Sequence, residues 1–273
     1  MNLDFTESEI ERYSRHILLR EVGGVGQAKL RAASVLVVGA GGLGSPVLLY
    51  LAAAGVGRIG IVDNDVVELS NLQRQIAHTT AMLGEPKTAS AARAARAINP
   101  RSLIEPHQMR LTAENALDLI HKYDLICDGT DNFATRLLVS DACVLAQKTL
   151  ISAAVSRFDG QLATFKPHLG GPCYRCLVPE APPPGLVPSC SEAGVFGAVV
   201  GVMGSLQATE TIKEILSLGT SLAGSLLLYD ALTPRFRTIS LPKDPHCPSC
   251  GAQPHWHDLA HHRSADQGGI CAR

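Results

Sequence analysis

Short apolar runs alternate with longer amphipathic or alanine-rich segments through the first part of the chain. Apolar runs of this length, bounded by turn residues, are typical of buried strands, and the longer segments between them are typical of helices. Strand, helix and strand in this order predict the βαβ unit of a parallel sheet. The first unit comprises, in chain order, strand 34–38, glycine-rich turn 39–44, helix 45–54 and strand 58–62.

The same alternation continues to about residue 155. The functional groups of such sheets gather at the carboxyl ends of the strands. Gly39, Asp63 and the segment 128–131 each follow a predicted strand directly, so they are candidates for a site. The other predicted elements are amphipathic helices within 6–32, helices at 86–98, 113–121 and 133–147, and strands at 102–106, 125–127 and 150–154.

The pattern changes in the second part of the chain. Runs at 160–166 and 225–230 predict strands with more antiparallel character, and residues 194–216 predict a long buried helix. Five prolines within 177–189 exclude a regular helix or strand and predict a mobile surface loop. The polar, histidine-rich stretch 251–273 predicts a disordered tail.

These elements together predict a Rossmann-like α/β fold whose mainly parallel sheet continues into an antiparallel part. Residues 1–155 would contain the N-terminal helices and a nucleotide-binding half, and residues 156–250 a second half of the same integrated domain. Residues 251–273 would be the tail.

The composition is that of an ordinary globular protein, with 46% apolar and 18% charged residues. A formal net charge of −1 and an aromatic content of 4% argue against a nucleic-acid surface. No apolar run is long enough to span a membrane, and the acidic start of the chain is unlike a secretory signal. We therefore expect a cytoplasmic protein that binds neither nucleic acid nor membrane.

The glycine-rich turn Gly-Ala-Gly-Gly-Leu-Gly at 39–44 contains the pattern Gly-x-Gly-x-x-Gly. Its glycines permit positive φ and close backbone approach, and the next helix offers free N–H groups to phosphate oxygens. Asp63 lies 19 residues beyond Gly44, the usual distance for an acid that binds ribose hydroxyls. The combination predicts nucleotide binding but does not distinguish NAD, FAD and ATP.

Basic residues near this turn favour a triphosphate. The polar run after Asp63 ends in Arg74, and Lys87 begins the next predicted helix. An arginine and a lysine beside the turn suit a triphosphate better than a pyrophosphate diester. Asp131, at the carboxyl end of another strand, is suited to hold Mg²⁺. The sequence therefore predicts a Rossmann-like ATP-binding fold that uses ATP and Mg²⁺.

Eight cysteines in a chain with no secretory signal indicate metal or thiol chemistry rather than disulfides. Two Cys-x-x-Cys pairs are typical of a tetrahedral Zn²⁺ site in which the protein fills every position. Such a closed site is structural, and it would tie the C-terminal segment to the proline-rich loop. The four predicted ligands are Cys173, Cys176, Cys247 and Cys250.

Five sequence features together resemble the MoeB/ThiF/HesA family, bacterial relatives of ubiquitin-activating enzymes. The resemblance covers roughly residues 5–251 and is greatest for the MoeB branch. One departure is His16, where relatives often have glutamine. The features are Arg12-Tyr13-Ser14-Arg15, the glycine turn, Ser-Asn-Leu-Gln-Arg-Gln at 70–75, Cys-Tyr-Arg-Cys at 173–176 and Cys-Pro-Ser-Cys-Gly at 247–251.

The resemblance implies a role for each residue of the ATP site. Arg74 and Lys87 would neutralise phosphate charge, and Asp131 would hold Mg²⁺. Arg15 would reach the site of the other subunit in a homodimer. Cys190 matches the position where ThiF-like relatives carry a reactive cysteine, so it is a candidate for a covalent role. The residues implied in ATP binding are Gly39, Gly41, Gly42, Gly44, Asp63, Ser70, Asn71, Leu72, Gln73, Arg74, Lys87, Asp131 and Asn132.

The same resemblance implies the reaction and the partners. The expected reaction is ATP-dependent adenylylation of the C-terminal glycine of a ubiquitin-like sulfur-carrier protein ending in Gly-Gly. A MoaD-like carrier for molybdenum cofactor biosynthesis is expected, and residues 156–250 would bind it. An ionised glycine carboxylate needs no general base, so positioning and charge neutralisation suffice. No sulfurtransferase-like segment follows the family-like region, so we expect a separate sulfur donor.

Three alternatives stay open. The first is the same chemistry on a ThiS-like carrier for thiamine or another sulfur pathway. The second is an NAD-dependent oxidoreductase, which accounts for the glycine turn and Asp63 but leaves Arg74, Lys87 and the paired cysteines unexplained. The third is a non-catalytic scaffold, although loss of activity should have erased some of the ATP-site residues. For Cys190 the alternative is an unreactive loop thiol.

Overall fold

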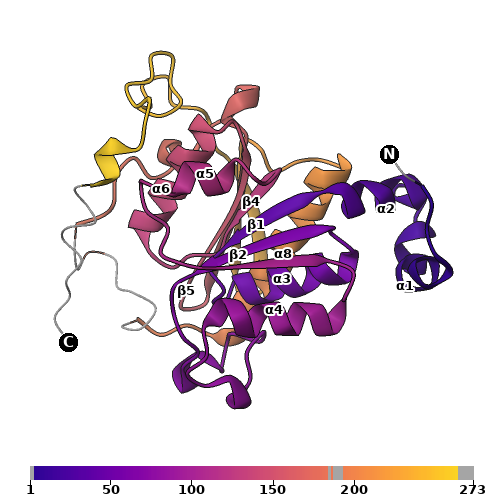
Figure 1. Ribbon diagram of the computed structural model, residues 1–273. Coiled ribbons are helices and arrows are strands. Elements are labelled where there is room, and N and C mark those ends of the chain that lie inside the picture. The colour runs from indigo at the N-terminus through magenta and orange to yellow at the C-terminus, as the bar shows by residue number, and fades with distance from the viewer. Residues whose placement is uncertain (1–2, 184–185, 187–192, 264–273) are drawn as a thin grey trace.

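The computed structural model describes residues 3–183, 186 and 193–263 (Figure 1). In this part of the chain one eight-stranded sheet runs through both predicted halves, in the order β3-β2-β1-β4-β5-β6-β7-β8. Neighbouring strands from β3 to β5 are parallel, and those from β5 to β8 are antiparallel. The expected parallel sheet with an antiparallel continuation is therefore confirmed.

Most elements lie within a few residues of their predicted positions. The strands are β1 (Ser34–Val38), β2 (Arg58–Asp63), β3 (Leu103–Gln108), β4 (Leu125–Asp128), β5 (Thr149–Ser156), β6 (Asp159–Phe165), β7 (Ser225–Asp230) and β8 (Arg235–Ser240). The helices are α1 (Glu7–Ile17), α2 (Gly23–Ala32), α3 (Gly44–Ala54), α4 (Lys87–Ile98), α5 (Ala116–Ile120), α6 (Phe133–Leu145) and α8 (Gly197–Leu216). Strand β8 was not predicted, because all its side chains are exposed and no apolar run marks it.

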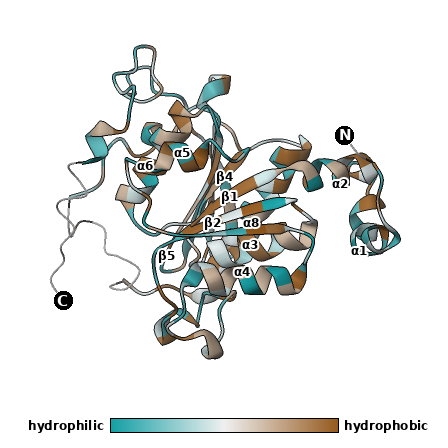
Figure 2. Cartoon of the chain, viewed as in Figure 1, coloured by the Kyte–Doolittle hydropathy of each residue, from teal (hydrophilic) through white to brown (hydrophobic). Residues whose placement is uncertain are grey.

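Helices cover both faces of the sheet. Figure 1 shows α3, α4 and α8 against one face and α5 and α6 against the other. Side chains of β1 point alternately to the two faces of the sheet. Val35 and Val37 pack in the core under α3 and α4, and Leu36 and Val38 pack in the core under α5 and α6. A strand buried on both faces has no polar side, which explains its continuous apolar run. Figure 2 shows apolar colouring along the central strands and on parts of the helices that cover them.

The order of the strands creates a crevice beside the glycine turn. Strand β1 pairs with β2 on one side and with β4 on the other. The chain runs from β1 to α3 on one face of the sheet and from β4 to α6 on the other, so the connections after these two neighbouring strands diverge. The glycine turn follows β1 directly, and residues 129–131 follow β4 directly. Gly39 has φ of +92°, and a Cβ atom on Gly44 would lie 1.8 Å from the carbonyl oxygen of Gly39. Only glycine therefore lets α3 begin this close to the turn.

The N-terminal helices α1 and α2 lie at one side of the sheet (Figure 1). Helix α1 begins with a capping box, in which the Thr6 side chain accepts from the Glu9 N–H and the Glu9 carboxylate accepts from the Thr6 N–H. The Asn99 side chain donates to the Tyr13 hydroxyl at 2.8 Å, which fastens α1 to the end of α4. Among the described helices, none has the length and apolar character that crossing a membrane requires.

Residues 251–263 differ from the expected disordered tail, because they pack against α6. The Nε2 atoms of His261 and His262 lie 3.0 and 2.8 Å from the Oδ2 atom of Asp141. The Trp256 ring stacks on the His261 ring, with centroids 4.0 Å apart. Composition alone suggested disorder, since a polar, histidine-rich end offers no apolar pattern. Residues 264–273 lie outside the described part of the chain.

Asp141 is the centre of this contact and is only 2% exposed. The Arg175 guanidinium donates to both of its carboxylate oxygens at 2.8–2.9 Å, and the Ser249 hydroxyl donates to Oδ1. Burial alone would raise the pKa of Asp141. Hydrogen bonds from His262, Arg175 and Ser249 outweigh burial and lower the pKa to about 2.

We predict that Asp141→Asn destabilises the protein by about 2–3 kcal/mol at pH 7, since it removes the charge that pairs with Arg175. The folded pKa lies below the unfolded value of about 3.9, so the carboxylate stabilises the fold above pH 4 and loses that effect as pH falls towards 2. Urea unfolding at several pH values would measure this difference. If the difference in unfolding free energy between wild type and Asp141→Asn is the same at pH 2 as at pH 7, the charge of Asp141 is not its cause. Asp118→Asn, at an exposed acid, is the control.

Candidate active site

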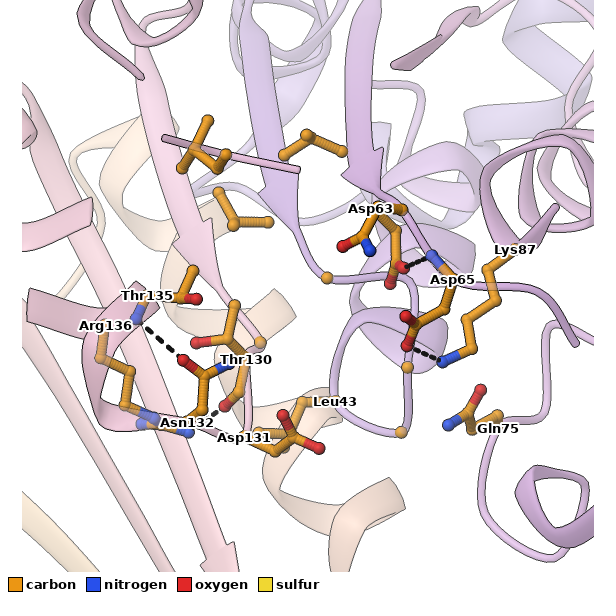
Figure 3. Close-up of a pocket in the computed structure, with 18 of the residues that line it drawn as sticks. Leu43, Asp63, Asp65, Gln75, Lys87, Thr130, Asp131, Asn132, Thr135 and Arg136 are labelled. Atoms are coloured by element: carbon orange, nitrogen blue, oxygen red, sulfur yellow. Dashed lines mark hydrogen bonds and ion pairs between the residues drawn. The ribbon is translucent and has the colours of Figure 1, made fainter. Parts of the chain in front are cut away.

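A cavity of about 360 Å³ opens at the carboxyl ends of β1, β2 and β4 (Figure 3). Its position is that of the crevice between the connections that follow β1 and β4. Both predicted sides of the site contribute to its wall. The predicted site residues that line it are Gly39, Gly41, Gly42, Asp63, Arg74, Lys87, Asp131 and Asn132.

One wall is a chain of charged groups beside the glycine turn. The carboxylate of Asp63 accepts from the Ala40 N–H and from the Asp65 N–H, both at 2.8 Å. The Asp65 carboxylate in turn pairs with the Lys87 ammonium at 2.8 Å. Lys87 is 7% exposed, so its charge is held inside the wall at the first turn of α4. Each carboxylate oxygen accepts more than one hydrogen bond, so Asp63 keeps capacity for ligand hydroxyls.

Arg74 lies over the glycine turn. The nearest Arg74 side-chain carbon would be 3.5 Å from a Cβ atom on Gly42, and a Val200 methyl would be 2.7 Å from it. Glycine at this position therefore makes room for the Val200 side chain of α8, whereas the arginine stem lies at an ordinary contact distance. The Arg74 guanidinium donates a hydrogen bond to the Ser70 carbonyl at 3.2 Å, which holds the arginine side chain against the segment that precedes it.

The opposite wall is the segment after β4. The buried carboxylate of Asp128 accepts from the Thr130 N–H and hydroxyl and from the Ser152 hydroxyl, at 2.7–3.0 Å. These bonds fix the loop that carries Asp131, an exposed residue at the cavity. Asn132 caps α6, because its side chain accepts from the Thr135 N–H at 2.9 Å. Capping is thus supplied by Asn132 rather than by Asp131.

Several implied residues do not line the cavity. Gly44 and the residues just before Arg74 are not in the cavity lining, and the Asn71 side chain belongs to the cap of the 3-10 turn η1 (Leu69–Asn71). Arg15 is exposed on α1 and does not line the cavity of its own chain. Contacts of these residues with ATP stay predictions. The residues concerned are Arg15, Gly44, Ser70, Asn71, Leu72 and Gln73.

The structure adds lining residues that sequence reasoning missed. The most notable is Arg136, which is 6% exposed and donates to the Thr130 carbonyl, with its guanidinium 3.9 Å from the Asp128 carboxylate. The only sequence feature that pointed to Arg136 was its position shortly after the Asp-Gly-Thr-Asp segment. An arginine within an apolar helix is, however, usually interpreted as a surface charge. The other added residues include Asn64, Asp65, Gln75 and Thr135.

Cys190 lies outside the described residues, as do residues 184–185 and 187–189 of the predicted mobile loop.

The four paired cysteines come together in a cluster away from the cavity. Their sulfur atoms all lie within 4.8 Å of one another, and the pairs Cys173–Cys247 and Cys176–Cys250 are each 3.5 Å apart. These separations are too long for disulfides and close to the roughly 3.8 Å between sulfurs around a tetrahedral zinc. Hydrogen bonds among the four thiols lower the pKa of Cys176 and Cys247 and raise that of Cys173 and Cys250. The donor set therefore fits a closed Zn²⁺ site.

Comparison with known proteins agrees with this geometry. A family model described as the ThiF family matches residues 13–249. A sulfur carrier protein adenylyltransferase of Thermus thermophilus is 53% identical over 93% of this chain and 96% of its own length. The adenylyltransferase and sulfurtransferase MOCS3 of Anopheles gambiae is 53% identical over 90% of this chain, which spans 56% of that longer protein.

A solved structure has the same fold. The crystal structure of E. coli MccB with MccA-N7isoASN superposes with a TM-score of 0.78 and 23% identity, over 91% of this chain and 76% of that one. The family model spans most of the chain, and the two curated relatives match more than half of their aligned residues. The chain therefore belongs to the ThiF family.

Proposed function

We propose that this protein uses Mg-ATP to adenylylate the C-terminal glycine of a ubiquitin-like sulfur-carrier protein. The observation that carries the proposal is one cavity at the strand switch point with cations on both walls. Arg74 and Lys87 lie beside the glycine turn, and Arg136 lies in the wall that carries Asp131. The printed name of the Thermus relative supports the carrier as substrate.

In this proposal the glycine turn and its neighbours bind ATP. Backbone N–H groups of the turn and of the first turn of α3 face phosphate oxygens, and the Asp63 carboxylate accepts from the ribose. The Arg74 guanidinium and the Lys87 ammonium neutralise phosphate charge. Asp65 keeps the ammonium in place until the phosphates compete for it.

The reaction needs an anion to attack a polyanion. The carrier carboxylate oxygen forms a bond to the α-phosphorus, the bond between that phosphorus and the bridging oxygen to the β-phosphate breaks, and pyrophosphate leaves with the electron pair. No proton moves in this step. Cations on opposite walls stabilise the charge on the α-phosphate and on the leaving group, so we assign catalysis to positioning and electrostatics.

Asp131 is the proposed Mg²⁺ ligand, because it is an exposed carboxylate on a loop that Asp128 fixes. When bound, Mg²⁺ would neutralise the pyrophosphate oxygens. Arg136 places a guanidinium behind this loop, where it would orient the Thr130 carbonyl.

The carrier is proposed to be MoaD-like and to serve molybdenum cofactor biosynthesis, with a ThiS-like carrier as the alternative. We propose that residues 156–250 bind it. The exposed edge strand β8, with Phe236 and Ile239 52% and 41% exposed, supports a protein surface there. The sulfur is proposed to come from a separate protein, and a covalent role of Cys190 stays a proposal.

A homodimer is proposed in which Arg15 completes the site of the partner subunit. Exposed apolar side chains in the N-terminal region support an interface, among them Leu18, Leu19 and Val25, which are 71%, 51% and 54% exposed. Arg15 itself is exposed and distinct from the lining of its own cavity, which agrees with action on a second subunit.

We predict that the protein catalyses ATP–pyrophosphate exchange only with a carrier ending in Gly-Gly. Arg74→Ala and Asp131→Ala should each reduce exchange about 100-fold or more, because each removes charge that stabilises the transition state. Arg93→Ala on the exposed face of α4 and Asp118→Asn on α5 are matched controls that keep full exchange.

A panel of MoaD-like and ThiS-like carriers decides the pathway within the same assay. Normal exchange by a folded Arg74→Ala or Asp131→Ala variant would refute the assigned roles. Carrier-independent hydride transfer to NAD would refute the proposed function itself.

Subunit mixing tests the role of Arg15. Arg15→Ala and Arg74→Ala variants should each be inactive, whereas an equal mixture of refolded or co-expressed subunits should recover about a quarter of wild-type exchange. Half of the dimers in such a mixture are mixed, and one of their two sites has neither change. A mixture as inactive as its components, or a fully active monomer, would contradict action in trans.

Metal analysis tests the cysteine cluster. We expect about one zinc per chain in freshly purified protein, and Cys250→Ser should lose it and lower Tm by about 5 °C or more. Cys143→Ala, a change at a buried cysteine outside the cluster, should keep the zinc. Wild-type protein that folds stably without bound metal would exclude a structural zinc site.

A further inference from the structure

A buried histidine holds the glycine turn from outside the cavity. His78 is 6% exposed and does not line the cavity. Its Nε2 atom lies 2.8 Å from the carbonyl oxygen of Ala40, the second residue of the turn. Its Nδ1 atom lies 2.9 Å from the Ser90 hydroxyl on α4. The ring thus connects the turn to the helix that begins with Lys87.

These partners fix the direction of each hydrogen bond. A carbonyl oxygen only accepts, so Nε2 carries the proton and donates to Ala40. In the neutral ring Nδ1 accepts from the Ser90 hydroxyl. Burial lowers the pKa of His78 and is only partly offset by the hydrogen bond to the Ala40 carbonyl, which raises it. Lys87 lowers the pKa further and Asp63 raises it, and the net direction is down. The ring is therefore neutral at pH 7.

The other backbone group of Ala40 is held as well. Its N–H donates to Asp63, and the chain of contacts continues through Asp65 to Lys87, with every distance 2.8 Å. The chain through His78 ends at Ser90, one turn further along α4. Both the N–H and the C=O of Ala40 are therefore connected, through these contacts, to residues in the first turns of α4.

Holding the Ala40 carbonyl also orients the next N–H. The peptide bond between Ala40 and Gly41 is trans, so its C=O and N–H point in opposite directions. Because the carbonyl points at His78, the Gly41 N–H points away from it, and Gly41 lines the cavity. Glycine tolerates both signs of φ, so this peptide could flip if nothing held its oxygen.

We propose that His78 is a positioning residue for ATP, which keeps the Ala40–Gly41 peptide in the orientation that offers its N–H to a phosphate oxygen. A flipped peptide would instead present a carbonyl oxygen to the phosphates, which repels them. The effect is on nucleotide binding, and the carboxylate attack is untouched once ATP is bound. This inference rests on the proposed use of ATP.

Replacements at His78 can distinguish the effect of its hydrogen bond to Ala40 from the effect of its side-chain volume. The Gln amide nitrogen reaches about as far as Nε2, whereas the Asn amide nitrogen reaches only as far as Nδ1. His78→Gln should therefore keep ATP affinity within about threefold of wild type, whereas His78→Asn and His78→Leu should weaken it about tenfold or more. His107→Gln is a matched control, since His107 lies on the outer strand β3 and forms its hydrogen bond with the Tyr123 hydroxyl, away from the glycine turn.

Two measurements test the proposal. Calorimetric titration with Mg-ATP gives affinity without any carrier, and carrier-dependent exchange gives KM for ATP and kcat separately. We expect His78→Asn to raise the dissociation constant and KM together, with kcat at saturating ATP within about threefold of wild type. Thermal unfolding of each variant identifies any that does not fold. If His78→Leu does not fold, the comparison of His78→Gln with His78→Asn still tests the proposal.

Each outcome has a distinct meaning. Wild-type protein that binds no ATP would overturn the proposed function and this inference with it. Wild-type protein that binds ATP, with folded His78→Asn binding equally well, would overturn only this inference. Equal weakening by Gln and Asn, in parallel with lower Tm, would show a merely structural role and also overturn it.

Discussion

The site depends on the pairing of β1 with β2 on one side and β4 on the other. Because these three strands are parallel, their carboxyl ends meet at one edge of the sheet, and the divergence of their connections opens the cavity there. The four core residues of β1 that follow Ser34 are at most 2% exposed, so the strand is fixed by packing on both faces. A rigid strand at this position gives the glycine turn a defined starting point.

Electrostatics then shapes the walls around that turn. The carboxylates of Asp63 and Asp65 link the turn to Lys87, and the buried Asp128 links the loop of Asp131 to β5 through Ser152. Acidic groups with fixed partners thus hold both backbone and cations in place before any ligand arrives. Such preorganisation is what a reaction between two anions requires, since no proton transfer can assist it.

The sequence predicted the site to the extent that the site is local. The glycine turn, Asp63, Arg74 and Lys87 lie within one βαβα segment, and their spacing along the chain already places them together. Asp131 was predictable because it follows a strand. Arg136 and His78 were not, because their importance comes from buried contacts with Thr130 and Ala40 that no periodic pattern records.

The same distinction explains the fold. Strands β1, β2 and β4 are buried on both faces and appear as apolar runs, whereas the exposed β8 depends on pairing with β7 and has no such run. Residues 251–263 were predicted to be a disordered tail, because the contacts that hold them are with Asp141, more than a hundred residues earlier in the chain. Contacts between distant polar residues are the part of the structure that composition and periodicity do not contain.

The most direct test of the account is the intact mass of the carrier protein after incubation with this protein, Mg-ATP and a pyrophosphatase. The account predicts a carrier that has gained one AMP group on its C-terminal glycine and remains bound to the enzyme, with none formed when the last glycine is deleted. ATP consumption that leaves the carrier mass unchanged would contradict it.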